Sequence, residues 1–272
     1  MRPPPALPPT LNKLFSIALL STLLVSCQST PTAARVTPPA ASGTPVVSAE
    51  PFWPAGGVFP AKGRTSSWPG FRAKNVERRT LFVQRRAQDQ DGIVFVGDSI
   101  TEGWKTLEAD FADLPLKVVN RGIGGDTTPN LLYRLQEDVL DLHPRALVMM
   151  IGTNDLGEHT APADIADNLK KMLQQIRAAY PQIPIAWCFV MPRKGDDTFP
   201  KRIRKLNTLI AKIAGSDPGV TLCDTYSPLA LPDGSSKPED FVPDRLHLNA
   251  AGYAVWRAGL DPVLSGWKLG TK

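Results

Sequence analysis

The sequence lacks the clusters that a metal centre needs, because its three histidines and three cysteines are scattered along the chain. It contains no His-x-x-x-His pair and no closely spaced cysteines, so a zinc site is not expected. Neither the G-x-G-x-x-G spacing nor the G-x-x-x-x-G-K-[ST] motif occurs, which argues against a nucleotide cofactor. We therefore expect a protein that works without cofactors.

The sequence also lacks an apolar run of the about 20 residues that a membrane-spanning helix needs. Its apolar stretch Leu14–Val25 is shorter and follows basic residues, as in the h-region of a signal peptide. The end of the stretch, Leu24-Val25-Ser26-Cys27, resembles a bacterial lipobox. Residues 1–27 are thus expected to be a lipoprotein signal peptide, with a lipidated Cys27 anchoring the mature chain in the cell envelope. An ordinary secretory signal with a chance cysteine is the alternative.

The next segment has few charges and almost no periodicity. Residues 28–70 are rich in Pro, Ala, Ser and Thr, a composition typical of an extended tether. The folded domain is then expected to span residues 71–272. Within it, Cys188 and Cys223 lie in apolar, strand-like runs. Free thiols are common in cores, so we expect them to be unpaired, although an oxidising compartment would also allow a disulfide.

The sequence pI of about 9.2 raises the question of nucleic-acid binding. Residues 1–92 hold 11 Lys and Arg against 4 Asp and Glu, whereas residues 93–272 hold 20 against 22. A nucleic-acid-binding domain would carry the basic excess on its folded body. Here the excess lies in the leader and the first helix, so no nucleic-acid partner is expected. The sequence gives no indication of the oligomeric state.

Strand and helix patterns alternate through the rest of the chain. Short, fully apolar runs are separated by segments with apolar residues at helical spacing, which is the pattern of a parallel sheet covered on both faces. We predict an α/β fold of the three-layer α/β/α, flavodoxin-like type with a five-stranded parallel sheet. The predicted strands are residues 92–96, 116–119, 146–151, 185–190 and 220–223.

Polar and small residues follow the strands where a plain connection would need only a turn. They comprise Gly97-Asp98-Ser99, the segment 120–128, Gly152-Thr153-Asn154-Asp155 and the segment 243–249. In open parallel sheets the ligand site lies outside the carboxyl ends of the strands. All four segments are therefore expected to meet at one rim.

Ser99 has two interpretations. It could cap the following helix, with Glu102 completing a capping box. It could also be a nucleophile, which requires a histidine base held by a carboxylate. His247 follows Asp244 by three residues, so one helical turn would bring the two together. The other two histidines fit less well, because His143 precedes a strand and His159 has no carboxylate at a fixed spacing. The sequence favours Ser99 as both a cap-like residue and a nucleophile.

An oxyanion needs donors that are held in place. The loop "GIGGD" can turn the N–H of Gly125 outward, because glycine tolerates unusual backbone angles. Asn154 offers a neutral side-chain donor from the next strand exit. The loop could instead be a plain turn in which Asp126 caps the next helix, and the two roles are compatible.

The four blocks Gly97-Asp98-Ser99, Gly125, Gly152–Asp155 and Asp244-x-x-His247 resemble, in the same order, those of the SGNH, or GDSL, hydrolase family. They are similar in particular to the catalytic subunits of intracellular platelet-activating-factor acetylhydrolase and to bacterial GDSL-type esterases. The resemblance implies a Ser99 nucleophile, a His247 base, an Asp244 orienting carboxylate, and an oxyanion hole of Ser99 N–H, Gly125 N–H and Asn154. Asp155 departs from the acetylhydrolase subunits, which usually carry a second asparagine there.

By this resemblance the protein is expected to hydrolyse esters, with short acyl groups, acetyl above all, on carbohydrates or polysaccharides as the first choice of substrate. A lysophospholipase or thioesterase that accepts longer acyl chains is the alternative enzyme. A binding module that kept the fold and lost turnover is a third possibility. The complete set of serine, glycine, asparagine, aspartate and histidine blocks argues against this last one.

Overall fold

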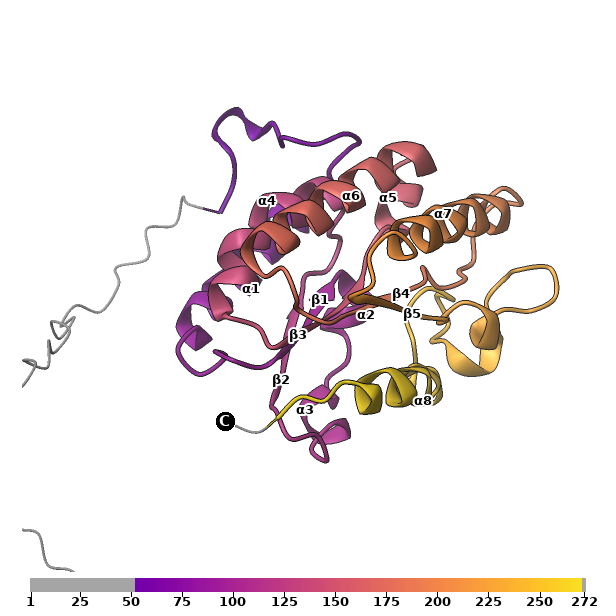
Figure 1. Ribbon diagram of the computed structural model, residues 1–272. Coiled ribbons are helices and arrows are strands. Elements are labelled where there is room, and N and C mark those ends of the chain that lie inside the picture. The colour runs from indigo at the N-terminus through magenta and orange to yellow at the C-terminus, as the bar shows by residue number, and fades with distance from the viewer. Residues whose placement is uncertain (1–51, 271–272) are drawn as a thin grey trace, which may run out of the picture. The chain divides into compact units, whose positions relative to one another are not determined.

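The computed structural model describes residues 52–270 (Figure 1). The predicted signal peptide, Cys27 and residues 28–51 of the predicted tether lie outside the described residues.

Five parallel strands form one sheet in the order β2-β1-β3-β4-β5. This arrangement confirms the predicted five-stranded, flavodoxin-like α/β fold. The strands lie within a few residues of the apolar runs that predicted them, and β2 starts and ends later than expected. They are β1 (Ile93–Gly97), β2 (Val118–Gly122), β3 (Ala146–Met150), β4 (Ile185–Cys188) and β5 (Val220–Cys223).

Helices cover both faces of the sheet, as Figure 1 shows. One face is covered by α4 (Thr128–Asp138), α6 (Pro162–Ala179) and α7 (Phe199–Ala214), with α1 (Phe71–Arg85) beside α4. The other face is covered by α2 (Ser99–Glu102), α3 (Leu107–Asp110) and α8 (Ala250–Gly266). The connections hold α5 (Thr153–Gly157) and four short 3₁₀ turns, Ala55–Gly57, Leu140–Leu142, Ser227–Leu229 and Pro238–Asp240.

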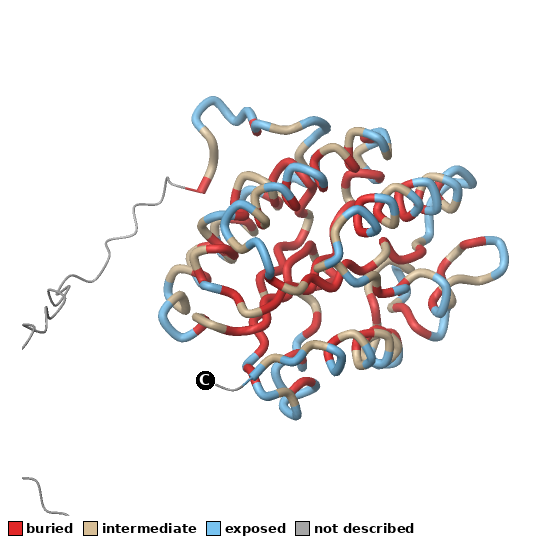
Figure 2. The backbone as a smooth tube through the Cα atoms, in the orientation of Figure 1, coloured by how far each residue is buried: buried red, intermediate tan, exposed pale blue. Residues whose placement is uncertain are grey.

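Alternate residues of the central strands enter opposite halves of the core. Val94 and Val96 of β1 pack under α4 and α6, whereas Ile93 and Phe95 pack against α3 and α8. All four side chains are buried, so the strand reads as continuously apolar rather than alternating. Figure 2 shows the sheet as buried backbone between two partly exposed helical layers. Burial of each side chain contributes about 1.5–3 kcal/mol to stability.

Residues 52–70 lie against this domain instead of extending away from it. Phe52 and Phe59 are buried, and Phe59 meets Tyr133 of α4 edge to face at 5.4 Å. Farther along, the Lys62 N–H donates to the Asn168 side chain of α6 at 3.1 Å. The predicted domain start at residue 71 is therefore too late, because aromatic anchors within a Pro- and Ala-rich segment fix it to the helices.

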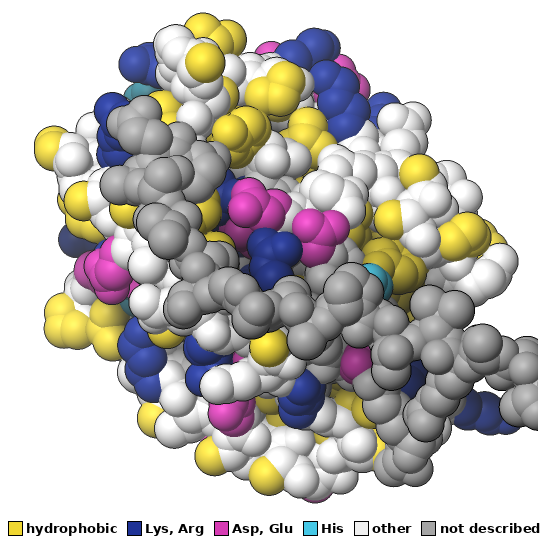
Figure 3. Space-filling model, turned by 90° about the vertical axis from the view of Figure 1, so that its left-hand side faces the viewer, with side chains coloured by type: hydrophobic (Ala, Val, Ile, Leu, Met, Phe, Trp, Pro, Cys, Tyr) yellow, Lys and Arg dark blue, Asp and Glu magenta, His cyan; other side chains and the backbone are white. Residues whose placement is uncertain are grey.

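Basic residues of α1 face acidic partners. Arg79 pairs with Asp138 at 2.7 Å, and Arg85 pairs with Asp89 at 3.1 Å. Lys and Arg side chains lie interspersed with Asp and Glu on the face shown in Figure 3. The basic excess of this helix is thus largely matched within the domain.

Cys188 and Cys223 are register partners on β4 and β5, and both are buried and free, as expected. Among the helices of residues 52–270, none combines the length and the apolar character needed to cross a membrane.

Candidate active site

Three strands end level with one another at the edge that holds the site. Gly97 of β1 is in register with Gly122 of β2 and with Met150 of β3. The residues after these strands therefore leave the sheet at the same edge. This edge brings together Ser99, the glycine loop 123–127 and Asn154.

Ser99 is the first residue of α2, and its side chain is not used as a cap. Asp98 is the N-cap, with its Oδ1 accepting the Ile100 N–H at 2.9 Å. The predicted capping box is also wrong, since Glu102 Oε2 accepts the Gly124 N–H at 2.6 Å. Because Asp98 takes the capping role, the Ser99 hydroxyl stays available for another partner.

That partner is His247. Its Nε2 lies 2.8 Å from Ser99 Oγ, and its Nδ1 lies 2.6 Å from Asp244 Oδ2. An ionised carboxylate only accepts hydrogen bonds, so Nδ1 carries the proton and Nε2 is left as an acceptor for the serine proton. The structure thus places Ser99, His247 and Asp244 in one hydrogen-bonded row.

Asp244 and His247 lie in a tight turn between β5 and α8, not on the predicted helical turn. Arg245 between them adopts a left-handed conformation with φ 59°. Asp244 Oδ1 accepts the backbone N–H groups of Leu246 and His247 at 2.8 and 2.9 Å. Burial by itself would raise the pKa of Asp244, but the hydrogen bonds from His247 and Leu246 lower it overall. Asp244 therefore remains a carboxylate.

Gly125 and Asn154 follow the two strands that flank β1, Gly125 after β2 and Asn154 after β3. Gly125 has φ +82°, and within residues 52–270 its N–H makes no hydrogen bond. Asn154 Nδ2 donates one hydrogen bond to the backbone carbonyl of Asp126 at 2.9 Å. An amide carries two N–H groups, so this bond fixes the orientation of Asn154 and leaves its second N–H free to donate.

The other two histidines lie away from this row. His143 stands before β3, at the amino end of the sheet, and its Nδ1 lies 3.0 Å from Gln90 Oε1. His159 is exposed in the connection between α5 and α6. Among residues 52–270, neither has a carboxylate partner like the one that holds His247.

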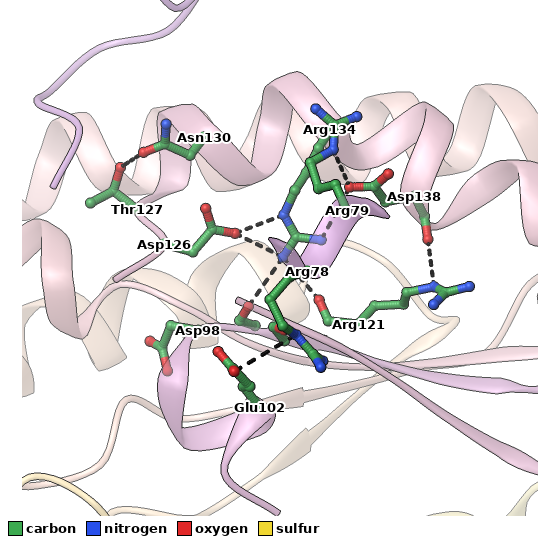
Figure 4. A network of polar contacts seen from close by, with 12 residues as sticks. Arg78, Arg79, Asp98, Glu102, Arg121, Asp126, Thr127, Asn130, Arg134 and Asp138 are labelled. Atoms are coloured by element: carbon green, nitrogen blue, oxygen red, sulfur yellow. Dashed lines mark hydrogen bonds and ion pairs between the residues drawn. The ribbon is translucent and has the colours of Figure 1, made fainter. Parts of the chain in front are cut away.

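A buried ionic network supports the glycine loop through Arg134 of α4 (Figure 4). The sequence interpretation missed this network. Arg134 of α4, 1% exposed, contacts the Asp126 carboxylate at 2.7 Å. The same guanidinium donates to the backbone carbonyls of Gly97 and Arg121, at 3.2 and 2.9 Å. One side chain therefore joins the ends of β1 and β2 to the loop that follows. Burial raises the pKa of Asp126 to about 6, although Arg134 opposes the shift.

Asp155 serves the scaffold in a similar way. Its Oδ1 accepts the N–H and the hydroxyl of Thr128, at 3.0 and 2.5 Å. Thr128 begins α4, so the contact ties α5, which carries Asn154, to the start of α4. Burial raises the pKa of Asp155 to about 7, and the hydrogen bonds from Thr128 reduce the shift. The contact between Asp155 and Thr128, which no sequence pattern indicates, thus fixes the turn that carries Asn154.

Comparison with known proteins places this geometry in a family. Residues 95–255 match the GDSL-like Lipase/Acylhydrolase family. The human platelet-activating factor acetylhydrolase IB subunit alpha2 is 33% identical over 188 residues, covering 66% of this chain and 78% of that protein. The bovine subunit alpha1 is 29% identical over 191 residues, covering 67% and 79%.

Solved bacterial structures share the fold. A lipase/acylhydrolase from Enterococcus faecalis superimposes with a TM-score of 0.57 at 25% identity, over 67% of this chain and 99% of that one. A GDSL-like lipase from Bacteroides thetaiotaomicron VPI-5482 gives the same TM-score and identity, over 68% and 96%. With the level strand exits and the row at Ser99, these similarities show that the chain belongs to the GDSL-like lipase/acylhydrolase family.

Proposed function

We propose that the protein hydrolyses carboxylic esters through Ser99, His247 and Asp244. The observation that supports this proposal is the hydrogen-bonded row, in which Ser99 Oγ lies 2.8 Å from His247 Nε2 and His247 Nδ1 lies 2.6 Å from Asp244 Oδ2. A serine hydroxyl needs an adjacent base to become a nucleophile, and a carboxylate fixes the tautomer of that base.

In the first step Ser99 Oγ attacks the ester carbonyl carbon while His247 Nε2 takes the hydroxyl proton. The carbonyl oxygen becomes an oxyanion, which accepts hydrogen bonds from the N–H groups of Gly125, Ser99 and the Asn154 amide. One such donor is worth about 3 kcal/mol in a comparable serine hydrolase. The C–O bond to the leaving alcohol then breaks, and His247 returns the proton to that alcohol. Water activated by the same histidine releases the acid and restores Ser99.

We infer that the protein removes short acyl groups, and acetyl esters of carbohydrates are the first choice of substrate. The similarity to proteins named as acetylhydrolases supports acetyl. The platelet-activating factor in their name is a weaker guide to the alcohol, because the leader expected from the sequence would send this protein to the cell envelope. Longer acyl chains, as in lysophospholipids or thioesters, are the competing choice.

The test is a series of 4-nitrophenyl esters of increasing acyl length, with Ser99→Ala as the control. The wild type should cleave the acetate faster than the octanoate, and Ser99→Ala should cleave neither. A preference for the octanoate would contradict the choice of short acyl groups. Equal activity in Ser99→Ala would contradict the nucleophile.

Anchoring through a lipidated Cys27 is part of the same proposal. It is supported by the resemblance of Leu24–Cys27 to a lipobox and by the Pro-rich sequence that follows it. Gln28 after the cysteine, rather than aspartate, favours the outer membrane. Mass spectrometry of the mature N-terminus should find an acylated cysteine, and an unmodified start at another residue would contradict the anchor.

A further inference from the structure

Trp68, which lies near the glycine loop of the proposed site, is half exposed to solvent. Its exposed fraction is 50%, whereas Phe52, Phe59 and Phe71 of the same region are buried. Within residues 52–270 it is the only aromatic residue among the strongly exposed large apolar side chains. Tryptophan combines a large, flat apolar face with a polar N–H, which suits it to contact a ligand that is itself partly apolar and partly polar.

Two glycines, Gly70 and Gly125, lie next to the indole ring of Trp68. A Cβ on Gly70 would stand 2.5 Å from Trp68 Cζ2, and a Cβ on Gly125 would stand 3.4 Å from Cε3. Both atoms belong to the six-membered ring. A side chain at Gly70 would collide with it, and a side chain at Gly125 would come into van der Waals contact with it. Trp68 thus lies beside the loop that carries the proposed oxyanion donor.

The backbone around Trp68 is fixed on both sides. Its carbonyl accepts the Phe71 N–H at 2.9 Å, and its N–H donates to Ser66 Oγ at 3.3 Å. The neighbouring Ser67 donates its N–H and its hydroxyl to Glu158 Oε1, at 2.6 and 2.8 Å. Glu158 directly follows α5, which carries Asn154, so the segment spans the glycine loop and the asparagine-bearing turn.

Ser99, the proposed nucleophile, is close to the same glycine loop. Gly124, next to Gly125 in the chain, would place a Cβ 3.8 Å from the Cβ of Ser99. An ester held at Ser99 with its oxygen toward Gly125 would therefore have Trp68 next to the same loop.

We propose that Trp68 is a substrate-binding platform on which a sugar ring of the ester stacks, an inference that rests on the proposed function. The C–H groups on one side of a pyranose ring form an apolar face that suits an aromatic surface, while its hydroxyls need polar neighbours. Ser66, Ser67 and Glu158 provide such neighbours. A long acyl chain would instead need an enclosed apolar groove, and these polar side chains do not favour one.

The experiment compares tetraacetyl-xylopyranose with 4-nitrophenyl acetate as substrates of the full chain. Trp68→Ala should raise the KM for the acetylated sugar about two- to tenfold more than the KM for nitrophenyl acetate. Trp68→Phe, which keeps an aromatic face, should recover most of the difference. Val58→Ala, an exposed residue of the same segment, is the matched control and should leave the ratio of kcat/KM values unchanged.

The outcomes separate the two proposals. If the wild type cleaves neither ester, the proposed function fails. If it cleaves both and Trp68→Ala leaves the ratio of kcat/KM values unchanged, the platform is wrong and the function stands. A loss of kcat that is equal for both substrates would assign Trp68 to support of the glycine loop and would also overturn the platform.

Discussion

His247 Nε2 lies 2.8 Å from Ser99 Oγ, although 148 residues separate the two in the chain. The contact depends on the sheet order, because β1 lies inside the sheet and the chain returns from the far edge strand β5 before it reaches His247. The Phe241–Leu248 bridge closes the loop that carries the histidine. A side-chain pair at this separation is thus held by backbone pairing and not by local sequence.

Replacement of the histidine tests the base. His247→Ala should lower kcat/KM on 4-nitrophenyl acetate roughly 10⁴- to 10⁶-fold, as removal of a base from other serine hydrolases does. The fold should survive, because the imidazole is partly exposed. His143→Ala and His159→Ala are the matched controls, with circular dichroism to check folding. A folded His247→Ala that keeps near-normal activity while His159→Ala loses it would assign the base to His159.

Replacement of the carboxylate tests the tautomer. Asp244→Asn can keep an oxygen facing the backbone N–H groups of Leu246 and His247, but it then presents an amide N–H to His247 Nδ1. The imidazole would have to accept there and carry its proton on Nε2, where it could no longer take the proton of Ser99. We expect kcat to fall roughly 10²- to 10⁴-fold with a smaller change in KM. Steady-state kinetics across pH 5–9 measures this, and unchanged kcat throughout would show that Asp244 does not orient the histidine.

Much of this site could be predicted from the sequence, because the residues involved follow strands whose apolar character is unmistakable. Ser99, Gly125 and Asn154 each stand a few residues after such a run, and parallel strands bring their carboxyl ends to one edge. The pairing of His247 with Asp244 could be inferred from their spacing, although the turn that achieves it was misjudged. A left-handed residue such as Arg245 leaves no mark in a sequence pattern.

The supporting contacts could not be predicted. Arg134 looks like a solvent-facing charge on an amphipathic helix, and only the packed structure shows that its guanidinium is buried among Asp126 and two strand-end carbonyls. The packing of residues 52–70 on the domain could not be predicted for a different reason. Its composition is that of a tether, and isolated aromatics such as Phe52 and Phe59 have no periodicity that would indicate what they contact.

Arg134 provides a test of whether the buried network positions the site. Arg134→Met would leave the Asp126 carboxylate buried without its partner, which should cost about 3–5 kcal/mol of unfolding free energy. The glycine loop would also lose its link to Gly97, so kcat should fall by up to about 100-fold while KM changes little. Urea unfolding and steady-state kinetics on the folded fraction measure the two effects.

The controls separate support of the fold from positioning of the donors. Arg134→Lys keeps the charge without the planar fork, and we expect partial recovery of stability but little recovery of kcat. Lys201→Met, on the exposed side of α7, should change neither quantity. If Arg134→Met loses stability and retains full kcat, the network holds only the fold.

Asp155 should make the protein less stable as the pH rises from about 4 to 7. Its pKa is raised to about 7 in the folded state, mainly by burial, against about 3.9 in an unfolded chain. Below pH 4 the carboxyl is protonated in both states. Between these values only the unfolded state ionises, which favours unfolding until the folded-state pKa is passed. Asp98 and Asp126 contribute in the same direction, since burial raises their pKa values to about 7 and about 6.

Asp155→Asn removes one of these buried carboxyl groups, while the amide oxygen can still accept the Thr128 N–H. The variant should therefore gain roughly 2–4 kcal/mol of unfolding free energy relative to the wild type when both are moved from pH 4 to pH 8. Urea unfolding at the two pH values measures the gain, with Asp197→Asn as an exposed control. Because Asn154 stands next to the mutated residue, kcat should be recorded too, and it should stay within a few-fold of wild type if the Thr128 contact persists. Parallel pH profiles for wild type and Asp155→Asn would show that the buried carboxyl ionises in the folded protein as readily as in the unfolded chain.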